Sequence, residues 1–165
     1  MEVNIRKATA QDYIPLCDLI DEVDALHRGQ LPRLFQKPPG PVRKYDYYWA
    51  LITDEKVGLF IAEVEKEIIG FVHAIVIDSP PISVLVPRFY AIVDNIGVKS
   101  DYQNHGIGKV LIKRIQDWAI EKGATSMEMN VYEFNETAFT FYTKLGYKTF
   151  MRRMRKELKV DDVAD

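Results

Sequence analysis

The stretch Gln103-Asn104-His105-Gly106-Ile107-Gly108-Lys109 is a glycine-rich turn between two apolar segments. The segment before it, Phe89 to Val98, is rich in β-branched and aromatic residues and predicts a strand. The segment after it repeats apolar residues at helical spacing and predicts a helix that ends at Gly123. Because Gly106 and Gly108 carry no Cβ atom, amide N–H groups can converge at the helix N-terminus and bind a phosphate. Lys109 adds one cation.

Two well-known phosphate loops do not match this turn. The nucleoside-triphosphate loop requires glycine five residues before Gly108, where this chain has Gln103. It also requires Ser or Thr after Lys109 to hold magnesium, and this chain has Val110. The dinucleotide loop would need its third glycine at Leu111 and an acidic residue at the end of a following strand. A Gly-x-Gly pair by itself does not identify the ligand.

Three motifs together resemble the GNAT superfamily of N-acetyltransferases. Within the turn the family prefers Arg or Gly at the positions of Asn104 and His105, a departure that affects side-chain contacts and leaves the backbone role intact. With the order of the upstream elements, the resemblance covers nearly the whole chain. The motifs are Asp94-Asn95-Ile96-Gly97-Val98, Gln103-x-x-Gly106-x-Gly108 and Asn135-x-x-Ala138-x-x-Phe141-Tyr142-x-x-Leu145-Gly146-Tyr147.

The resemblance implies that acetyl-CoA is a cosubstrate held largely by backbone groups. The segment from Ile96 to Val98 would bind the pantetheine arm, the turn would bind the pyrophosphate, and two adjacent parallel strands would splay apart to admit the arm. Gly97 fits independently, because glycine inside a strand often marks a close backbone approach. Asn135 contacts the cofactor in the family and is also a good helix N-cap. The implied cofactor-binding residues are Ile96, Gly97, Val98, Gln103, Asn104, His105, Gly106, Ile107, Gly108, Lys109, Asn135 and Tyr142.

The implied reaction is direct attack of a primary amine on the thioester in a ternary complex. An alkylamine with a pKa of ~10.4 is neutral in only about one molecule in 2,500 at pH 7, so a base or a chain of waters is expected. Asp94 is the candidate base, because an acidic residue often stands there in the family; a structural aspartate at a strand end is the alternative. Tyr142, the family's usual proton donor, is the candidate acid, although an aromatic residue at helical spacing also suits a core. His27 and His73 are competing bases.

The acceptor amine is not identified by the sequence. In the family its site lies beside the first helices, where this chain carries carboxylates and aromatic rings that suit a cation. A charged run on a helix is also typical of a solvated face, and the rings can pack in a core. The residues concerned are Asp18, Asp21, Glu22, Asp24, Tyr45, Tyr47, Tyr48 and Trp49.

The pattern of elements predicts an α/β (α+β) sandwich. Its order, β-α-α-β-β-β-α-β-α-β, predicts a mixed central sheet of about six to seven strands with helices on both faces. We expect a single domain over residues 1–165 with a short acidic tail at about 160–165. The other predicted elements are a strand at Val3 and Ile5, a helix begun by Thr9 and Asp12, a loop from Arg28 to Pro41, a helix from Tyr45 to Ile52, a hairpin of Gly58 to Val64 and Ile68 to Ile77, a loop over a cleft from Asp78 to Pro87, a strand from Ser126 to Tyr132, a helix capped by Asn135 and closed by Gly146, and a last strand from Tyr147 to Met154.

Composition excludes several other classes. With a net charge of −2, the protein does not have the positive field of a dedicated nucleic-acid binder. One basic cluster does precede the acidic tail. The single cysteine, Cys17, cannot form an intrachain disulfide, and no stretch resembles a signal peptide or a membrane span, so we expect a cytoplasmic protein. No Cys or His cluster predicts a metal site, and a homodimer stays open. The basic cluster consists of Lys148, Arg152, Arg153, Arg155, Lys156 and Lys159.

Two alternatives to the enzyme remain at this point. One is a non-catalytic acetyl-CoA-binding module for sensing or assembly, which Tyr142 and the intact glycine pair disfavour. The other is a nucleic-acid-binding domain that uses the basic cluster, which the net charge disfavours.

Overall fold

The computed structural model describes residues 2–158, which fall into two compact units, 1–130 and 131–165. Among the described residues of the second unit there is one helix, α4 (Glu136–Lys144). The single domain stays a prediction. The elements of the first unit are β1 (Asn4–Lys7), the 3₁₀ turn η1 (Ala10–Asp12), α1 (Tyr13–Gln30), α2 (Tyr45–Thr53), β2 (Val57–Val64), β3 (Glu67–Asp78), β4 (Phe89–Val98), the 3₁₀ turn η2 (Ser100–Tyr102), α3 (Ile107–Glu121) and β5 (Met127–Met129).

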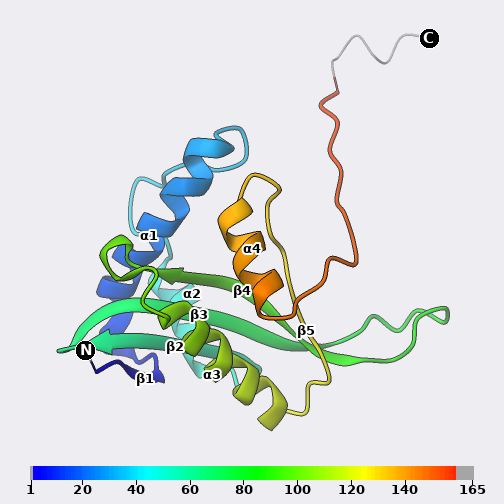
Figure 1. Cartoon of the computed structure of the whole chain (residues 1–165), viewed down its shortest axis with the longest axis horizontal. Coiled ribbons are helices and arrows are strands. Elements are labelled where there is room, and N and C mark those ends of the chain that lie inside the picture. Colours follow the sequence, from blue (N-terminus) through cyan, green and yellow to red (C-terminus); the bar gives the residue numbers. More distant parts are fainter. Residues whose placement is uncertain (1, 159–165) are drawn as a thin grey trace. The chain divides into compact units, whose positions relative to one another are not determined.

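The sheet of the first unit has the order β1-β2-β3-β4-β5 (Figure 1). Neighbouring strands are antiparallel except β4 and β5, which are parallel. This mixed sheet confirms the predicted α/β class, and β4 has the predicted bounds. Between β4 and the glycine-rich turn the chain makes the short turn η2, where a direct connection was predicted.

The predicted six to seven strands were too many, because residues 2–158 contribute five. The strand predicted from Ser126 to Tyr132 is only Met127–Met129, and the one predicted from Tyr147 to Met154 does not form. Apolar side chains of that last segment lie in solvent, with Phe150 70% and Met154 93% exposed. A strand is stabilised by the surface on which it packs, and this segment has none. Lys159 and the acidic tail lie outside the described residues.

Helices cover both faces of the sheet, as predicted. Successive side chains of β2 point to opposite faces and so contact different helices. Leu59 and Ile61 pack against Leu16, Leu19 and Ile20 of α1 and Tyr48 of α2. The neighbouring Phe60 lies on the other face, where the guanidinium of Arg114 in α3 is 4.3 Å from its ring centre. In Figure 1, α3 lies in front of the strands and α2 behind them.

Two strand glycines let helices approach the sheet closely. A Cβ atom on Gly58 would lie 2.7 Å from the indole ring of Trp118 in α3. A Cβ atom on Gly97 would lie 2.3 Å from Cγ2 of Val23 in α1 and 2.9 Å from the Phe71 ring. The side chains of Val23 in α1 and Phe71 in β3 therefore occupy the space beside Gly97, and its predicted role in cofactor binding stays a prediction.

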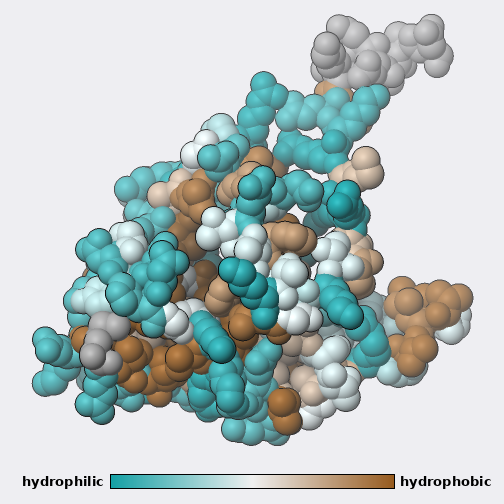
Figure 2. Space-filling model, viewed as in Figure 1, coloured by the Kyte–Doolittle hydropathy of each residue, from teal (hydrophilic) through white to brown (hydrophobic). Residues whose placement is uncertain are grey.

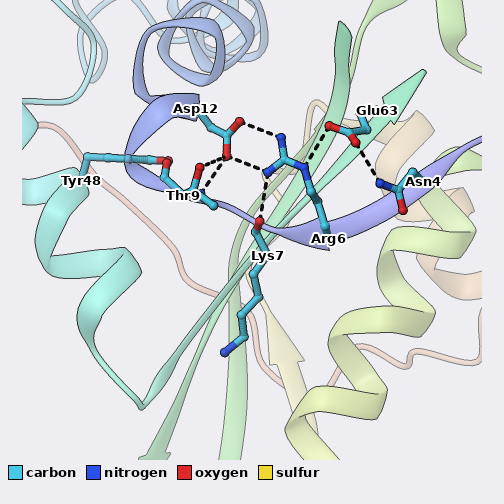
Figure 3. Close-up of polar contacts among 7 residues, drawn as sticks. All are labelled: Asn4, Arg6, Lys7, Thr9, Asp12, Tyr48 and Glu63. Atoms are coloured by element: carbon cyan, nitrogen blue, oxygen red, sulfur yellow. Dashed lines mark hydrogen bonds and ion pairs between the residues drawn. The ribbon is translucent and has the colours of Figure 1, made fainter. Parts of the chain in front are cut away.

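The start of α1 is held by a buried ion-pair network, drawn in Figure 3. Arg6 donates two hydrogen bonds to Asp12, at 2.8 and 2.9 Å, and a third to Glu63 of β2 at 2.9 Å. Asp12 also accepts the Thr9 amide at 2.7 Å, which confirms the predicted capping box. The Tyr48 hydroxyl donates to the Thr9 carbonyl, so this network joins β1, β2, α1 and α2.

The loops differ in detail from their predicted bounds. The loop expected from Arg28 begins after α1 ends at Gln30, and α2 follows at Tyr45. The loop expected over a cleft, residues 79–88, extends beyond the sheet in Figure 1 and lines none of the hollow described below. Its tip is apolar in Figure 2, with Val84 86% and Val86 76% exposed.

Candidate active site

The strand β4 carries a β-bulge in its middle. Asn95 pairs with His73 of β3 and Val93 pairs with Ala74, so Asp94 is an extra residue without a partner in this ladder. Bulges bend a strand and redirect a side chain, and they occur often beside active sites. The sequence reasoning singled out Asp94 from its type and position and did not foresee the bulge.

Beyond the bulge, β4 has an open backbone edge. The pairing with β5 ends at Val93 opposite Met129, and no other described strand continues it. The Lys99 amide bonds the Ile69 carbonyl at 2.8 Å, which fixes the alternation of the antiparallel ladder. By this alternation, Ile96 and Val98 direct their backbone N–H and C=O groups away from β3, toward the side on which β5 lies.

The turn that follows is a helix N-terminus built around two left-handed residues. Gly106 has φ 82° and is the N-cap of α3, and Asn104 has φ 63°. The Gln103 side-chain amide donates to the Val98 carbonyl at 3.0 Å, and His105 Nδ1 lies 2.7 Å from the Gln103 carbonyl oxygen. These bonds join the turn to the open edge of β4.

The turn leaves space and donors for an anion. The first amide bonded within α3 is that of Val110, which donates to the Gly106 carbonyl at 3.2 Å. The amides of Ile107, Gly108 and Lys109 precede it at the positive end of the helix dipole. A Cβ atom on Gly106 would meet nothing within 4 Å, so solvent or a ligand has access to the backbone there.

A hollow lies between α1, α2 and the strands β2 to β4. Its floor is mostly apolar, and its polar side chains are contributed by β3, β4, α2 and the segment before α2. Cys17 donates a weak hydrogen bond to the Arg43 carbonyl at 3.7 Å. The hollow is lined by Leu16, Cys17, Ile20, Arg43, Tyr47, Tyr48, Leu51, Leu59, Phe71, His73, Asp94 and Asn95.

Asp94 and His73 form a pair in this hollow. His73 Nδ1 lies 3.4 Å from Asp94 Oδ2, and the Asp94 side chain is 62% exposed. The imidazole beside it lowers the pKa of the Asp94 carboxyl, burial opposes this effect, and the positive charges of His73 and Arg43 add to the lowering. His27, the other competing base, lies on α1 outside the hollow, with Nδ1 3.3 Å from the Val23 carbonyl oxygen.

Several of the carboxylates predicted for the acceptor site bind groups of the chain itself. Asp21 pairs with Arg28 at 2.7 Å, and Asp24 pairs with Arg43 at 3.0 Å. Glu22 accepts the Ser100 amide at 3.0 Å, which connects α1 to η2. The Asp21 pair lies within α1, whereas Asp24 and Glu22 hold α1 to the segment before α2 and to η2.

The aromatic candidates divide between core and surface. Tyr48 is buried, and burial raises its pKa well above the usual range. Tyr47 lines the hollow and is 46% exposed. Tyr45 and Trp49 stack with ring centres 6.4 Å apart, and both are exposed, as is Asp18.

The second unit holds the other two predicted site residues. Asn135 is the N-cap of α4, because its Oδ1 accepts the Ala138 amide at 3.0 Å. Gly146 follows α4 with φ 91°, as the sequence predicts. Burial raises the pKa of Tyr142 to about 12, with a smaller contribution from Tyr147, so its phenol is protonated at neutral pH.

A mixed sheet whose β4 edge opens beside a helix N-terminus is the arrangement expected of the GNAT fold. The sequence model of the Acetyltransferase (GNAT) family matches residues 20–147, and the chain belongs to this family. It is 31% identical over 144 residues to an uncharacterized N-acetyltransferase of Methanocaldococcus jannaschii. That match covers 87% of this chain and 60% of the relative, so the chain spans less than two thirds of that protein.

Two solved structures show the same fold. A tetramutant of the BH1408 protein from Bacillus halodurans superposes with a TM-score of 0.88 at 24% identity, covering 94% of this chain and 99% of that one. The structure of AAC(6')-Iy in complex with the bisubstrate analogue CoA-S-monomethyl-acetylneamine has a TM-score of 0.75 at 17% identity, covering 96% and 99%.

Neither a metal cluster nor a membrane-spanning helix occurs among the described residues. Among residues 2–158 no three His, Cys, Asp or Glu side chains are grouped to hold a metal ion. No helix in the described part of the chain is long and apolar enough to cross a membrane.

Proposed function

We propose that this chain is an N-acetyltransferase that moves the acetyl group of acetyl-CoA to a primary amine. The observation that carries the proposal is the open edge of β4 leading into the N-terminus of α3. Ile96 and Val98 present backbone groups along this edge, and the Gln103 side chain bonds Val98 from the turn. An extended arm with a phosphate at its end fits such a path, because strand edges bind extended chains and helix N-termini bind anions.

The cosubstrate supplies an acetyl thioester, and the chain supplies its binding groups. Within the segment from Ile96 to Val98, the outward backbone of Ile96 and Val98 would hold the pantetheine arm, and the turn from Gln103 to Lys109 would hold the pyrophosphate. Three features support this assignment: the outward backbone of β4, the free approach to Gly106 and the exposed cation of Lys109. An amide of the β4 edge, at Ile96 or Val98, would stabilise negative charge that develops on the thioester oxygen.

Two side chains would manage protons. Removal of the proton from the amine would depend on Asp94, which lines the hollow beside the β4 edge. Tyr142 would protonate the departing thiolate, and its pKa of about 12 supports this role because the phenol keeps its proton at neutral pH. Asn135 would contact the cofactor in addition to capping α4.

The amine would enter the hollow between α1, α2 and β4. Asp94 is the carboxylate among its lining residues, and Tyr47 adds an exposed aromatic ring. Both suit a cationic amine. The cytoplasmic location, the oligomeric state and the identity of the amine stay predictions or open questions.

The proposal is tested by calorimetric titration with acetyl-CoA, with pantetheine as the control that lacks the nucleotide and its phosphates. We expect binding of acetyl-CoA and much weaker binding of pantetheine. Gly106→Arg should abolish acetyl-CoA binding, because it forces a side chain onto a residue with φ 82° at the anion site. Equal binding by this variant would place the cofactor elsewhere, and no binding at millimolar acetyl-CoA would remove the proposal.

Turnover separates the enzyme from the non-catalytic binding module. Thiol release from acetyl-CoA is followed in a screen of primary amines with the native chain and with Tyr142→Phe. The enzyme predicts release that Tyr142→Phe lowers while the affinity for acetyl-CoA stays unchanged. Acetyl-CoA binding without thiol release for any amine would favour the binding module.

A further inference from the structure

The bulge in β4 places Asp94 and Asn95 together beside His73. Paired residues of neighbouring strands share one face, so Asn95 and His73 lie on the same face of the sheet. In a regular strand Asp94 would lie on the opposite face. The extra residue relaxes this rule, and both Asp94 and Asn95 line the hollow with His73.

The surroundings of His73 fix which nitrogen carries its proton. His73 is only 8% exposed, and its Nδ1 faces Asp94 Oδ2 at 3.4 Å. An ionised carboxylate can only accept, so Nδ1 carries the hydrogen. Nε2 is buried and has no hydrogen-bond partner within residues 2–158. Nδ1–H is therefore the donor that His73 directs at Asp94.

We propose that His73 is a positioning residue: its Nδ1–H holds the Asp94 carboxylate at the hollow so that the free carboxylate oxygen receives the acceptor amine as an ammonium ion. This deepens the proposed function and rests on it. It also argues against His73 as the base, because its Nδ1 faces Asp94 and its Nε2 is sealed.

The other charged and titratable groups that face the pair do not replace Asp94. Arg43, from the segment before α2, is engaged by Asp24 at 3.0 Å. On α2, burial raises the pKa of both Tyr47 and Tyr48, which keeps them neutral. On α1, burial raises the pKa of Cys17, which keeps the thiol protonated. Asp94 is thus the anionic group among the residues that line the hollow.

The direction of the Asp94 pKa supports an ammonium-binding role. The imidazole of His73 lowers the pKa of the carboxyl from the ordinary 3.8, so the carboxyl is ionised in the neutral range and well below it. Its side chain is 62% exposed, so one oxygen can face His73 while the other stays accessible. Such a carboxylate binds a cation strongly relative to a neutral amine.

The test uses two variants of one residue. In His73→Asn the side-chain amide nitrogen stands close to where Nδ1 stands and can donate to Asp94, whereas His73→Leu fills the site without a donor. Carbon-detected NMR titration of the Asp94 carboxyl gives its pKa in each protein without any ligand. We expect a pKa below 3.8 in the native chain and in His73→Asn, and a value at or above 3.8 in His73→Leu.

A second readout follows the binding of butylammonium at pH 7 by chemical-shift changes at Asp94, with butanol as the uncharged control. We expect about a tenfold weaker affinity in His73→Leu and recovery in His73→Asn. An unchanged Asp94 pKa and unchanged butylammonium affinity in His73→Leu would overturn the proposal, as would His73→Asn behaving like His73→Leu in a folded protein. Neither readout needs turnover, so absence of acetyl transfer with the expected shifts would remove the proposed function and keep the pair.

Discussion

Asp12 and Asp94 are two carboxylates with lowered pKa values in opposite surroundings. Asp12 lies in the network of Figure 3, with its side chain 8% exposed and four hydrogen bonds from Arg6 and Thr9. The hydrogen bond from Arg6 is the largest cause of its low pKa. Asp94 has one close partner, His73, and its side chain is 62% exposed.

The difference shows that a perturbed pKa does not by itself identify a reactive group. The Asp12 carboxylate accepts four hydrogen bonds from Arg6 and Thr9, which leaves it no acceptor site for a ligand. Asp94 keeps free acceptor capacity at the mouth of a hollow beside an open strand edge. Function is indicated by an ionised group that the fold positions and does not fully satisfy.

The largest effect is expected from Asp94→Asn. We expect kcat/KM for an amine acceptor to fall ~10²-fold or more, because the anion is lost while the shape is kept. The free energy of unfolding should change by less than about 1 kcal/mol, since the site is exposed. Steady-state kinetics and urea unfolding check this, and a stability loss that matches the rate loss would make Asp94 a structural residue.

Asp12→Asn should show the reverse pattern. We expect the free energy of unfolding to fall by about 2 kcal/mol, because the buried anion that pairs with Arg6 is lost. Acetyl-CoA affinity should stay as it is. Urea unfolding measures the stability and calorimetry measures the acetyl-CoA affinity. An unchanged unfolding midpoint would show that the Asp12 network does not stabilise the fold.

The two carboxylates should also differ in acid. A lowered native pKa stabilises the fold above the ordinary value of 3.8, and that stability is lost as the pH falls through the native pKa. The deficit of Asp12→Asn relative to the native chain should therefore be full at pH 5 and shrink below pH 3.8. Unfolding curves from pH 5 to pH 2 measure it, and a constant deficit would exclude the ionised state of Asp12 as its cause.

The smallest effect is expected at Asn135, whose side-chain oxygen already accepts the Ala138 amide. Asn135→Ala should destabilise α4 by ~1 kcal/mol through loss of the N-cap, whereas Asn135→Asp keeps a capping oxygen. Hydrogen exchange at the first amides of α4 measures the change. Loss of acetyl-CoA affinity in both variants would show a cofactor contact, and loss in neither would limit Asn135 to the cap.

The sequence predicts the parts of the molecule that depend on near neighbours. The turn around Gly106, the bounds of β4 and the hairpin of β2 and β3 follow from local patterns. The strand expected at Tyr147 to Met154 failed because strand formation depends on a packing surface and not on pattern alone.

The site was predicted less completely, for a related reason. Asp94 was found by its residue type, but its partner His73 depends on register across two strands and on one extra residue. Acidic candidates on α1, such as Asp24 and Glu22, bind Arg43 and the Ser100 amide, partners that no local pattern indicates. Side-chain pairing between distant segments is the part that required the fold.

Because Asp94 is one extra residue in β4, deletion of that residue alone could remove the β-bulge. If the codon for Asp94 were deleted, Val93 and Asn95 would become consecutive, and their partners Ala74 and His73 already are. The pairing of β4 with β3 would then be regular, without a bulge. A straighter β4 could extend its pairing with β5 beyond Val93. A single in-frame deletion would thus remove the bulge and the proposed carboxylate together.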